Sequence, residues 1–267
     1  MENTDFKEID AFEGHDLSVK LRSKKMIVWF LIFAVVMLFG GITSAIMVLY
    51  GKLLWVHIQP PSIFWIGNAL IVLSSATLII ALRALKAGKQ STALFGTLAT
   101  FLLGLGFVYT QNTGWNEMAA MGMGNTITQT EQGLKQSRWN TLGKLNGEYG
   151  TNYYFELNGQ KLVKEGENYY YVSPDQSRED KTLEVQTTFN ASGAMLSVLI
   201  YLHIAHLFFG LIYLLVNLVR LKKGTLNKDN WISLNSNGMY WHFMGILWIY
   251  LFFFIFYIRS ILIFYAA

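Results

Sequence analysis

The chain has 267 residues, of which 53% are hydrophobic and 14% charged, with five histidines, no cysteine and a formal net charge of +4. This balance excludes an ordinary soluble domain, and the lack of cysteine excludes thiolate ligands, disulfides and a dinuclear copper site of the cysteine type. The basic residues gather at the ends of hydrophobic segments, where membrane orientation accounts for them, so we expect no nucleic-acid partner.

Residues 1–25 change from acidic to basic without an apolar face, which predicts a tail outside the membrane. Five uncharged stretches follow in the sequence, and each is long enough to cross about 30 Å of hydrocarbon as a helix. These stretches are residues 26–50, 62–82, 91–112, 191–219 and 232–258. We therefore predict an all-α integral membrane protein, with three transmembrane helices in residues 26–114 and two in residues 191–267.

Basic residues mark one side of this predicted membrane domain. They precede the first helix and fill the short loops after the second and fourth helices, whose ends carry Arg83 and Arg220. The positive-inside rule then predicts a cytoplasmic amino terminus and a carboxyl terminus on the opposite side. Arg83 and Arg220 are also candidates to hold phospholipid head groups as bidentate donors, and simple topology anchoring explains either arginine equally well.

Residues 115–190 lose the hydropathy of the neighbouring segments, which predicts a soluble insertion on the outer side. Within the insertion, Asn158 and Gly159 suit the two positive-φ positions of a type I′ turn and predict a β-hairpin. Residues 169–172 are a candidate third strand, and residues 130–145 are a weaker helix candidate. The aromatic residues of this insertion form either the core of a small cap or a docking surface for a partner such as a cytochrome domain.

His203 and His206 lie three residues apart in the fourth predicted helix, a spacing that a metal or haem site can use. A haem shared with His242 is disfavoured, because the helical rise puts the histidines of the two helices about 15 Å apart along the membrane normal. Neither helix contains an acidic residue that could complete a metal site. We interpret these histidines as groups that hydrogen-bond to neighbouring helices, and the scarcity of ionisable residues within the membrane disfavours a transporter.

Short motifs along the chain follow an order that resembles subunit III of the haem-copper respiratory oxidases. The residues that carry the resemblance are Pro60 and Pro61 at the start of the second helix, Trp115 and Glu117 after the third, His203, His206, Gly210 and Arg220 in the fourth, and Tyr240, Trp241, His242 and Phe243 in the last. The resemblance implies a five-helix form of the subunit III bundle, in which the first one or two helices stand apart across a lipid-filled cleft. We expect helices one and two to face the other three.

The same resemblance implies an accessory subunit of a proton-pumping cytochrome c oxidase in the bacterial inner membrane. Such a subunit has no catalytic residue and no cofactor of its own, and it stabilises the catalytic subunit I and its proton uptake. Haem and copper are expected in the partner subunits I and II, and phospholipids are expected as ligands. Residues 115–190 are a candidate contact with a cytochrome c domain or a larger respiratory complex. Subunit III of a quinol oxidase is the alternative, with a small secondary transporter from another class.

Three positions depart from the family pattern. Val35 stands where the first helix of the family carries a carboxylate, and Gly245 stands where the last helix carries an aspartate. Asn235 replaces an acidic residue that commonly precedes that last helix. The part that the family plays in proton uptake is therefore not expected to transfer unchanged to this chain.

Overall fold

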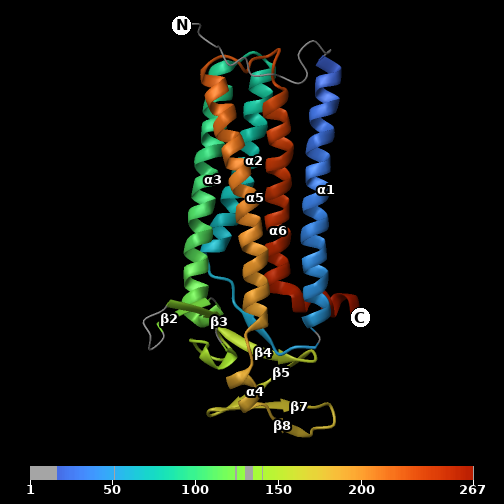
Figure 1. Ribbon diagram of the computed structural model, residues 1–267, viewed down its shortest axis with the longest axis vertical. Helices are drawn as coiled ribbons and strands as arrows, with labels where there is room; N and C mark the ends of the chain where they lie inside the picture. The colour runs from blue at the N-terminus through green and yellow to red at the C-terminus, as the bar shows by residue number, and fades with distance from the viewer. Residues whose placement is uncertain (1–16, 51, 124, 130–134, 140, 267) are drawn as a thin grey trace.

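The computed structural model describes residues 17–50, 52–123, 125–129, 135–139 and 141–266. Among these residues, five helices are long and apolar enough to cross a membrane, which confirms the predicted fold class. They are α1 (Leu17–Tyr50), α2 (Ile63–Lys86), α3 (Gln90–Met118), α5 (Ala191–Lys222) and α6 (Ile232–Ala266). All described strands lie beyond one end of these helices, which we call the outer end, and α1 begins at the opposite end, which we call the inner end (Figure 1).

Two of these helices extend beyond their predicted limits. α1 begins at Leu17, so residues 17–25, predicted to be part of a tail, form its first turns. Lys, Arg, Leu and Ser dominate this segment, and Lys, Arg and Leu favour helix even outside the apolar span. α3 continues to Met118, so Trp115 and Glu117 lie in its last turn rather than in the outer insertion.

α2 and α3 form the closest helix pair of the bundle, and α2 also packs against α6. A Cβ atom added to Gly96 of α3 would lie 2.9 Å from the Cβ atom of Ala81 in α2, so only small residues permit this approach. The hydroxyl groups of Thr77 and Thr100 add a hydrogen bond of 2.8 Å between the two helices. The expectation that helices one and two together face the other three is therefore wrong, because α2 belongs to the bundle.

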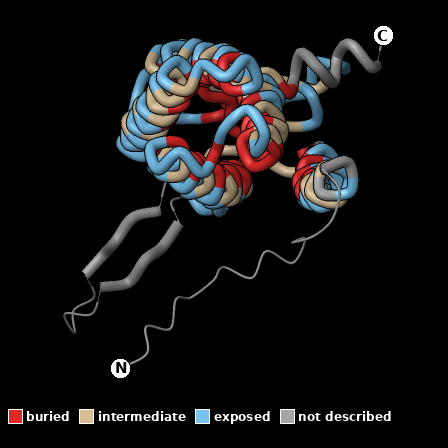
Figure 2. Tube along the Cα trace, turned by 90° about the horizontal axis from the view of Figure 1, so that it is seen from above, coloured by how far each residue is buried: buried red, intermediate tan, exposed pale blue. Residues whose placement is uncertain are grey.

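α1 is the helix that stands beside the bundle. It packs against α6 and, less extensively, against α5, and viewed end-on it lies next to the group formed by the other helices (Figure 2). Its buried side chains are Ile32, Val35, Phe39, Thr43, Ile46 and Tyr50. The described side chains of residues 19–31 are half-buried or exposed. α1 is thus in close contact with the bundle along its outer half and leaves it along its inner half.

The outer region contains the predicted hairpin. β4 (Tyr153–Leu157) pairs with β5 (Gln160–Lys161), and the φ angles of 51° at Asn158 and 77° at Gly159 confirm the left-handed turn between them. The other edge of β4 pairs with β1 (Trp55–Ile58), which belongs to the connection between α1 and α2. The sequence analysis predicted no strand in that connection.

Two further sheets complete the outer region. β6 (Val163–Glu165), β7 (Asn168–Val172) and β8 (Arg178–Asp180) form one sheet, so residues 169–172 do not extend the hairpin as predicted. β7 lies in the middle of this second sheet, where its two edges pair with β6 and β8.

The helix predicted over residues 130–145 is wrong where the structure describes it. β3 (Lys135–Trp139) pairs with β2 (Asn125–Gln129), and a single turn of 3-10 helix follows at Leu142–Lys144. The backbone pairing with β2 overrides a weak helix propensity. Residues 130–134 and 140 lie outside the described residues. A short helix, α4 (Thr182–Thr187), leads into α5.

The tyrosines of the insertion pack on one another. The ring centroid of Phe155 lies 5.3 Å from that of Tyr169, and the ring centroid of Tyr149 lies 5.4 Å from that of Tyr169. Tyr153, Phe155 and Tyr169 are all buried. These contacts favour the interpretation of the aromatic residues as the core of a small cap.

Candidate functional site between the first helix and the bundle

His203 lies fully buried in α5 at the meeting of four helices. Its ring centroid lies 6.5 Å from those of Phe39 in α1 and Phe107 in α3, and 5.3 Å from that of Trp248 in α6. Neither ring nitrogen has a hydrogen-bond partner among the described residues. The hydrogen bond to a neighbouring helix that we expected for this histidine is thus replaced by contacts with aromatic rings.

His206 makes its side-chain hydrogen bond within its own helix. Its Nδ1 atom lies 2.6 Å from the carbonyl oxygen of Leu202, which requires the proton on Nδ1. The link to α6 uses the backbone instead, because the Tyr240 hydroxyl donates to the His206 carbonyl oxygen at 2.9 Å. The expected bond between helices exists here, but the histidine ring does not make it.

Trp241 occupies a slot between two glycines. A Cβ atom added to Gly104 of α3 would lie 2.8 Å from the Trp241 ring, and one added to Gly210 of α5 would lie 3.3 Å from it. On a third side, Trp241 Nε1 donates to the Ser74 hydroxyl of α2 at 3.0 Å. The sequence motif residues Gly210 and Trp241 are therefore brought together, and a fully buried indole joins all four helices of the bundle.

The other motif residues are more dispersed. His242 is half-buried in α6, and it lies about 9 Å along the helix from Trp248, the residue that contacts His203. Trp115 packs its ring 6.2 Å from Phe64. Glu117 and Arg83 are exposed at opposite ends of the bundle. The structure thus separates His242 from His203 by less than the predicted distance of about 15 Å, and the bond from Tyr240 to the His206 carbonyl oxygen brings His206 nearer still to the depth of His242.

Two grooves flank the inner half of α1. One, of about 870 Å³, lies toward α5 and is lined by Lys24, Arg220 and Lys223 together with apolar side chains of α5. The other, of about 590 Å³, lies toward the start of α6. Its lining includes Arg22, Lys25, Trp29, Trp231 and Asn235. Among the residues that the structure describes, no acidic side chain lines either groove, and the basic side chains of both lie beside an apolar wall.

The three departures from the family pattern have structural counterparts. Val35 is buried in the packing face of α1. A Cβ atom at Gly245 would lie 3.3 Å from Ile71, so this glycine permits close contact between α6 and α2. Asn235 lines the smaller groove beside Arg22 and Lys25. At the first two positions, packing occupies the place where a carboxylate would need solvation.

Several side chains of the site were not predicted from the sequence. Lys24 and Lys223 belong to the positive clusters that indicate the orientation, but their grouping around a groove depends on how α1 leaves the bundle. A buried polar cluster at the outer end of α1 was not predicted either. Among the described residues, no group of three or more His, Asp or Glu side chains could hold a metal ion.

Five apolar spans, interlocked by small residues and buried aromatic rings, define a multi-pass integral membrane protein of helical-bundle type. Residues 179–260, which include α5 and most of α6, match the family model of cytochrome c oxidase subunit III. This segment of the chain is therefore similar to the subunit III family.

Three curated relatives agree with this assignment. The chain is 37% identical over 54 residues to cytochrome c oxidase subunit 3 of Alkalihalophilus pseudofirmus, covering 20% of this chain and 26% of the relative. It is 33% identical over 54 residues to cytochrome c oxidase subunit 3 of Rhipicephalus sanguineus, covering 20% and 21%. It is 31% identical over 68 residues to the probable quinol oxidase subunit 3 of Staphylococcus saprophyticus, covering 26% and 34%. The similarity thus spans about a third or less of each relative.

Proposed function

We propose that this chain is an accessory subunit III of a proton-pumping haem-copper terminal oxidase, with cytochrome c oxidase as the first candidate. The observation that carries the proposal is the Trp241 slot, because the family segment supplies both Gly210 and Trp241. Trp241 of the same segment forms a hydrogen bond with Ser74 of α2 and packs against Gly104 of α3. The family motif therefore serves the packing of the whole bundle.

The proposed role is mechanical. The motif residues His203, Gly210 and Trp241 are buried in contacts between helices, where they shape a rigid surface instead of meeting a substrate. In this proposal the rigid bundle stabilises subunit I in aerobic electron transport. Subunits I and II then hold the haem and copper.

The two grooves are the proposed phospholipid sites. Lys24, Arg220 and Lys223 line the same groove and suit a phosphate-bearing head group, and the apolar side chains of α5 suit the acyl chains. Arg83 is exposed at the same end of the bundle and is the second proposed contact with head groups. Positive charge at this end supports a cytoplasmic amino terminus, with the outer sheets and the carboxyl terminus in the periplasm of a bacterial inner membrane.

The outer insertion is the proposed contact with a cytochrome c domain or a larger respiratory complex. Because its central tyrosines pack into a cap core, the proposal rests on the exposed strands β6 and β8. Their side chains carry both signs of charge, as in Lys164 and Glu165. The surface of a partner would thus need charges of both signs that complement these side chains.

A quinol oxidase is the second candidate, since one relative is a probable quinol oxidase subunit 3 and its identity to this chain is close to that of the others. Purification of the tagged chain in mild detergent tests both candidates. If the chain is a subunit III, a large multi-helix partner should copurify with it, together with a haem spectrum that belongs to that partner. A copper-bearing subunit II in the same complex identifies cytochrome c as the donor, and its absence identifies quinol. A colourless, solitary chain contradicts the proposal and favours a small secondary transporter.

A further inference from the structure

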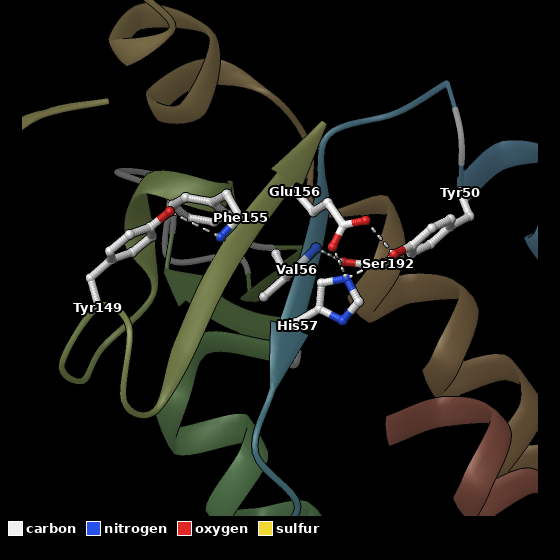
Figure 3. A network of polar contacts seen from close by, with 7 residues as sticks. All are labelled: Tyr50, Val56, His57, Tyr149, Phe155, Glu156 and Ser192. Carbon is white, nitrogen blue, oxygen red and sulfur yellow. Dashed lines mark hydrogen bonds and ion pairs between the residues drawn. The ribbon is translucent and has the colours of Figure 1, made fainter. Parts of the chain in front are cut away.

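A buried cluster of polar side chains lies at the outer end of α1. The Tyr50 hydroxyl, at the last residue of the helix, donates to Oε1 of Glu156 in β4 at 2.6 Å. His57 Nε2, in β1, lies 3.0 Å from Oε2 of Glu156 and 3.1 Å from the Tyr50 hydroxyl. Figure 3 shows the three side chains directed at one another from three elements. Their exposed fractions are 7%, 8% and 2% for Tyr50, His57 and Glu156.

The geometry assigns the donor roles. The Tyr50 hydrogen is used toward Glu156, so the contact between His57 and the Tyr50 oxygen requires a hydrogen on Nε2. That hydrogen is present in the imidazolium and in one neutral tautomer, so the cluster persists in either charge state of the histidine. The carboxylate accepts from two directions, which offsets the cost of its burial.

Surrounding contacts hold each member in place. The His57 ring stacks on Tyr154 with centroids 4.7 Å apart, and the Tyr50 ring packs edge-on against Trp55 at 5.5 Å. The backbone N–H of Val56 donates to the Ser192 hydroxyl near the start of α5 at 3.4 Å. β1 is thus attached on one side to the sheet and on the other to the bundle.

This cluster helps to hold α1 against the bundle. Apolar helices gain little from associating in lipid, so their association depends on close packing and polar contacts. The outer half of α1 has both, since the Tyr250 hydroxyl donates to the Thr43 hydroxyl at 3.2 Å and Tyr50 enters the cluster. The inner half faces the two grooves instead. We propose that Tyr50, His57 and Glu156 form a clasp that fixes the outer end of α1 and makes it the pivot about which the inner end leaves the bundle.

The clasp goes beyond the proposed function and does not depend on it. It gives the outer region the role of positioning the membrane helix α1. It also makes the width of both grooves depend on a contact at the other end of α1.

Spin-label distances test the clasp in the full chain, reconstituted in lipid nanodiscs. The natural sequence has no cysteine, so spin labels attach only to the two cysteines that are introduced in each pair. One pair, Val48→Cys with Thr151→Cys, reports on the outer end of α1. The other, Met26→Cys with Lys222→Cys, reports on the inner end. All four positions are exposed.

Tyr50→Phe removes the hydroxyl and keeps the ring against Trp55. The clasp predicts loss of the single narrow distance at the outer pair and a shifted, broader distance at the inner pair. Tyr109→Phe, at a 70% exposed tyrosine of α3, is the matched control and leaves both distances unchanged. An outer distance in Tyr50→Phe as narrow as in the natural chain overturns the proposal.

A double-mutant cycle distinguishes loss of the clasp from general destabilisation of the chain. Tyr50→Phe and Glu156→Gln alter the two partners of one hydrogen bond, and Glu156→Gln also alters the contact with His57. The double variant should therefore broaden the outer distance by less than the sum of the two single variants. Additive broadening would mean that the two residues act independently, and the clasp would then be rejected.

Discussion

The indole nitrogen of Trp241 and the hydroxyl of Ser74 form a hydrogen bond of 3.0 Å across 167 positions of sequence. Ser74 in turn donates to the carbonyl oxygen of Ile71 in its own helix at 2.7 Å. The bond joins α6 to α2 where both side chains are fully buried. A motif that marks the family in sequence therefore acts here as a cross-link between helices.

Trp241→Phe should lower the thermal midpoint of the detergent-solubilised chain. The change leaves the Ser74 hydroxyl without its indole donor and opens a cavity between Gly104 and Gly210, which together cost about 2–4 kcal/mol. Scanning fluorimetry provides the measurement. Trp29→Phe, at a 56% exposed tryptophan, is the control and should shift the midpoint little. Equal midpoints for the two variants would contradict a structural role for Trp241.

Gly104→Ala and Gly106→Ala should act in opposite directions, although they lie two residues apart in α3. A Cβ atom at position 104 would meet Trp241 at 2.8 Å and Leu211 at 2.9 Å, so overpacking should cost about 1–3 kcal/mol. At position 106 the nearest atom is Leu70 Cδ1 at 3.5 Å, and alanine favours helix over glycine by up to about 1 kcal/mol. Midpoints measured on both variants decide this, and a stable Gly104→Ala variant would show that the slot can widen.

Neutralising the larger groove should reduce bound anionic phospholipid. Lys24→Gln combined with Arg220→Gln removes two of the charges that line it, and head-group affinity should fall and lose its dependence on salt. Native mass spectrometry of the chain released from nanodiscs counts the retained lipids. Lys52→Gln combined with Lys144→Gln is the charge-matched control, because both lysines are exposed at the opposite end of the bundle and neither is among the residues that line the grooves. Equal lipid retention in both variants would leave topology anchoring as the role of Arg220.

The outer region should lose stability in alkali. Burial raises the pKa of the Tyr149 hydroxyl to about 12, and burial also raises the pKa of Tyr153 and Tyr169. The folded region then retains protons that the unfolded region releases from about pH 10, so stability should fall as the pH rises from about 10 to about 12. Hydrogen exchange at the amides of β4 measures this loss.

Tyr149→Phe provides the comparison for the alkaline experiment. It removes the donor to the Leu162 carbonyl oxygen, so its protection is lower at pH 7, but its further loss in alkali should be smaller than that of the natural chain. Parallel pH profiles for the two chains would rule out Tyr149 as the group responsible.

The spanning helices were predictable because apolar length is a local signal. The α6 span, Ile232–Ile258, has the predicted bounds, and Asn158 with Gly159 formed the predicted turn because two adjacent residues determine that turn. β1 was not predictable, since all four of its side chains are buried and no alternation of polar and apolar residues marks it. Its partner β4 lies beyond two membrane helices, and nothing local indicates such a pairing.

The types of residue at the site could be predicted from the sequence, but their arrangement in space could not. The helical rise overestimated the separation of the α5 histidines from His242, because Tyr240 contacts the backbone of His206. The basic residues at the helix ends predicted a positively charged face. That His203 would lie among Phe39, Phe107 and Trp248 depends on three helices meeting it at one depth. The grouping of Lys24 with Arg220 depends on the divergence of α1, which no single helix encodes.

The pairing of β1 with β4 also sets an order of events during biosynthesis. Tyr50 and Glu156 are 106 positions apart, so a growing chain exposes the end of α1 long before its acceptor is translated. α2 and α3 are translated before that acceptor, joined by their short connection. The outer end of α1 is therefore secured only after α2 and α3 have been made, and errors in making the outer sheet would appear as a misplaced α1.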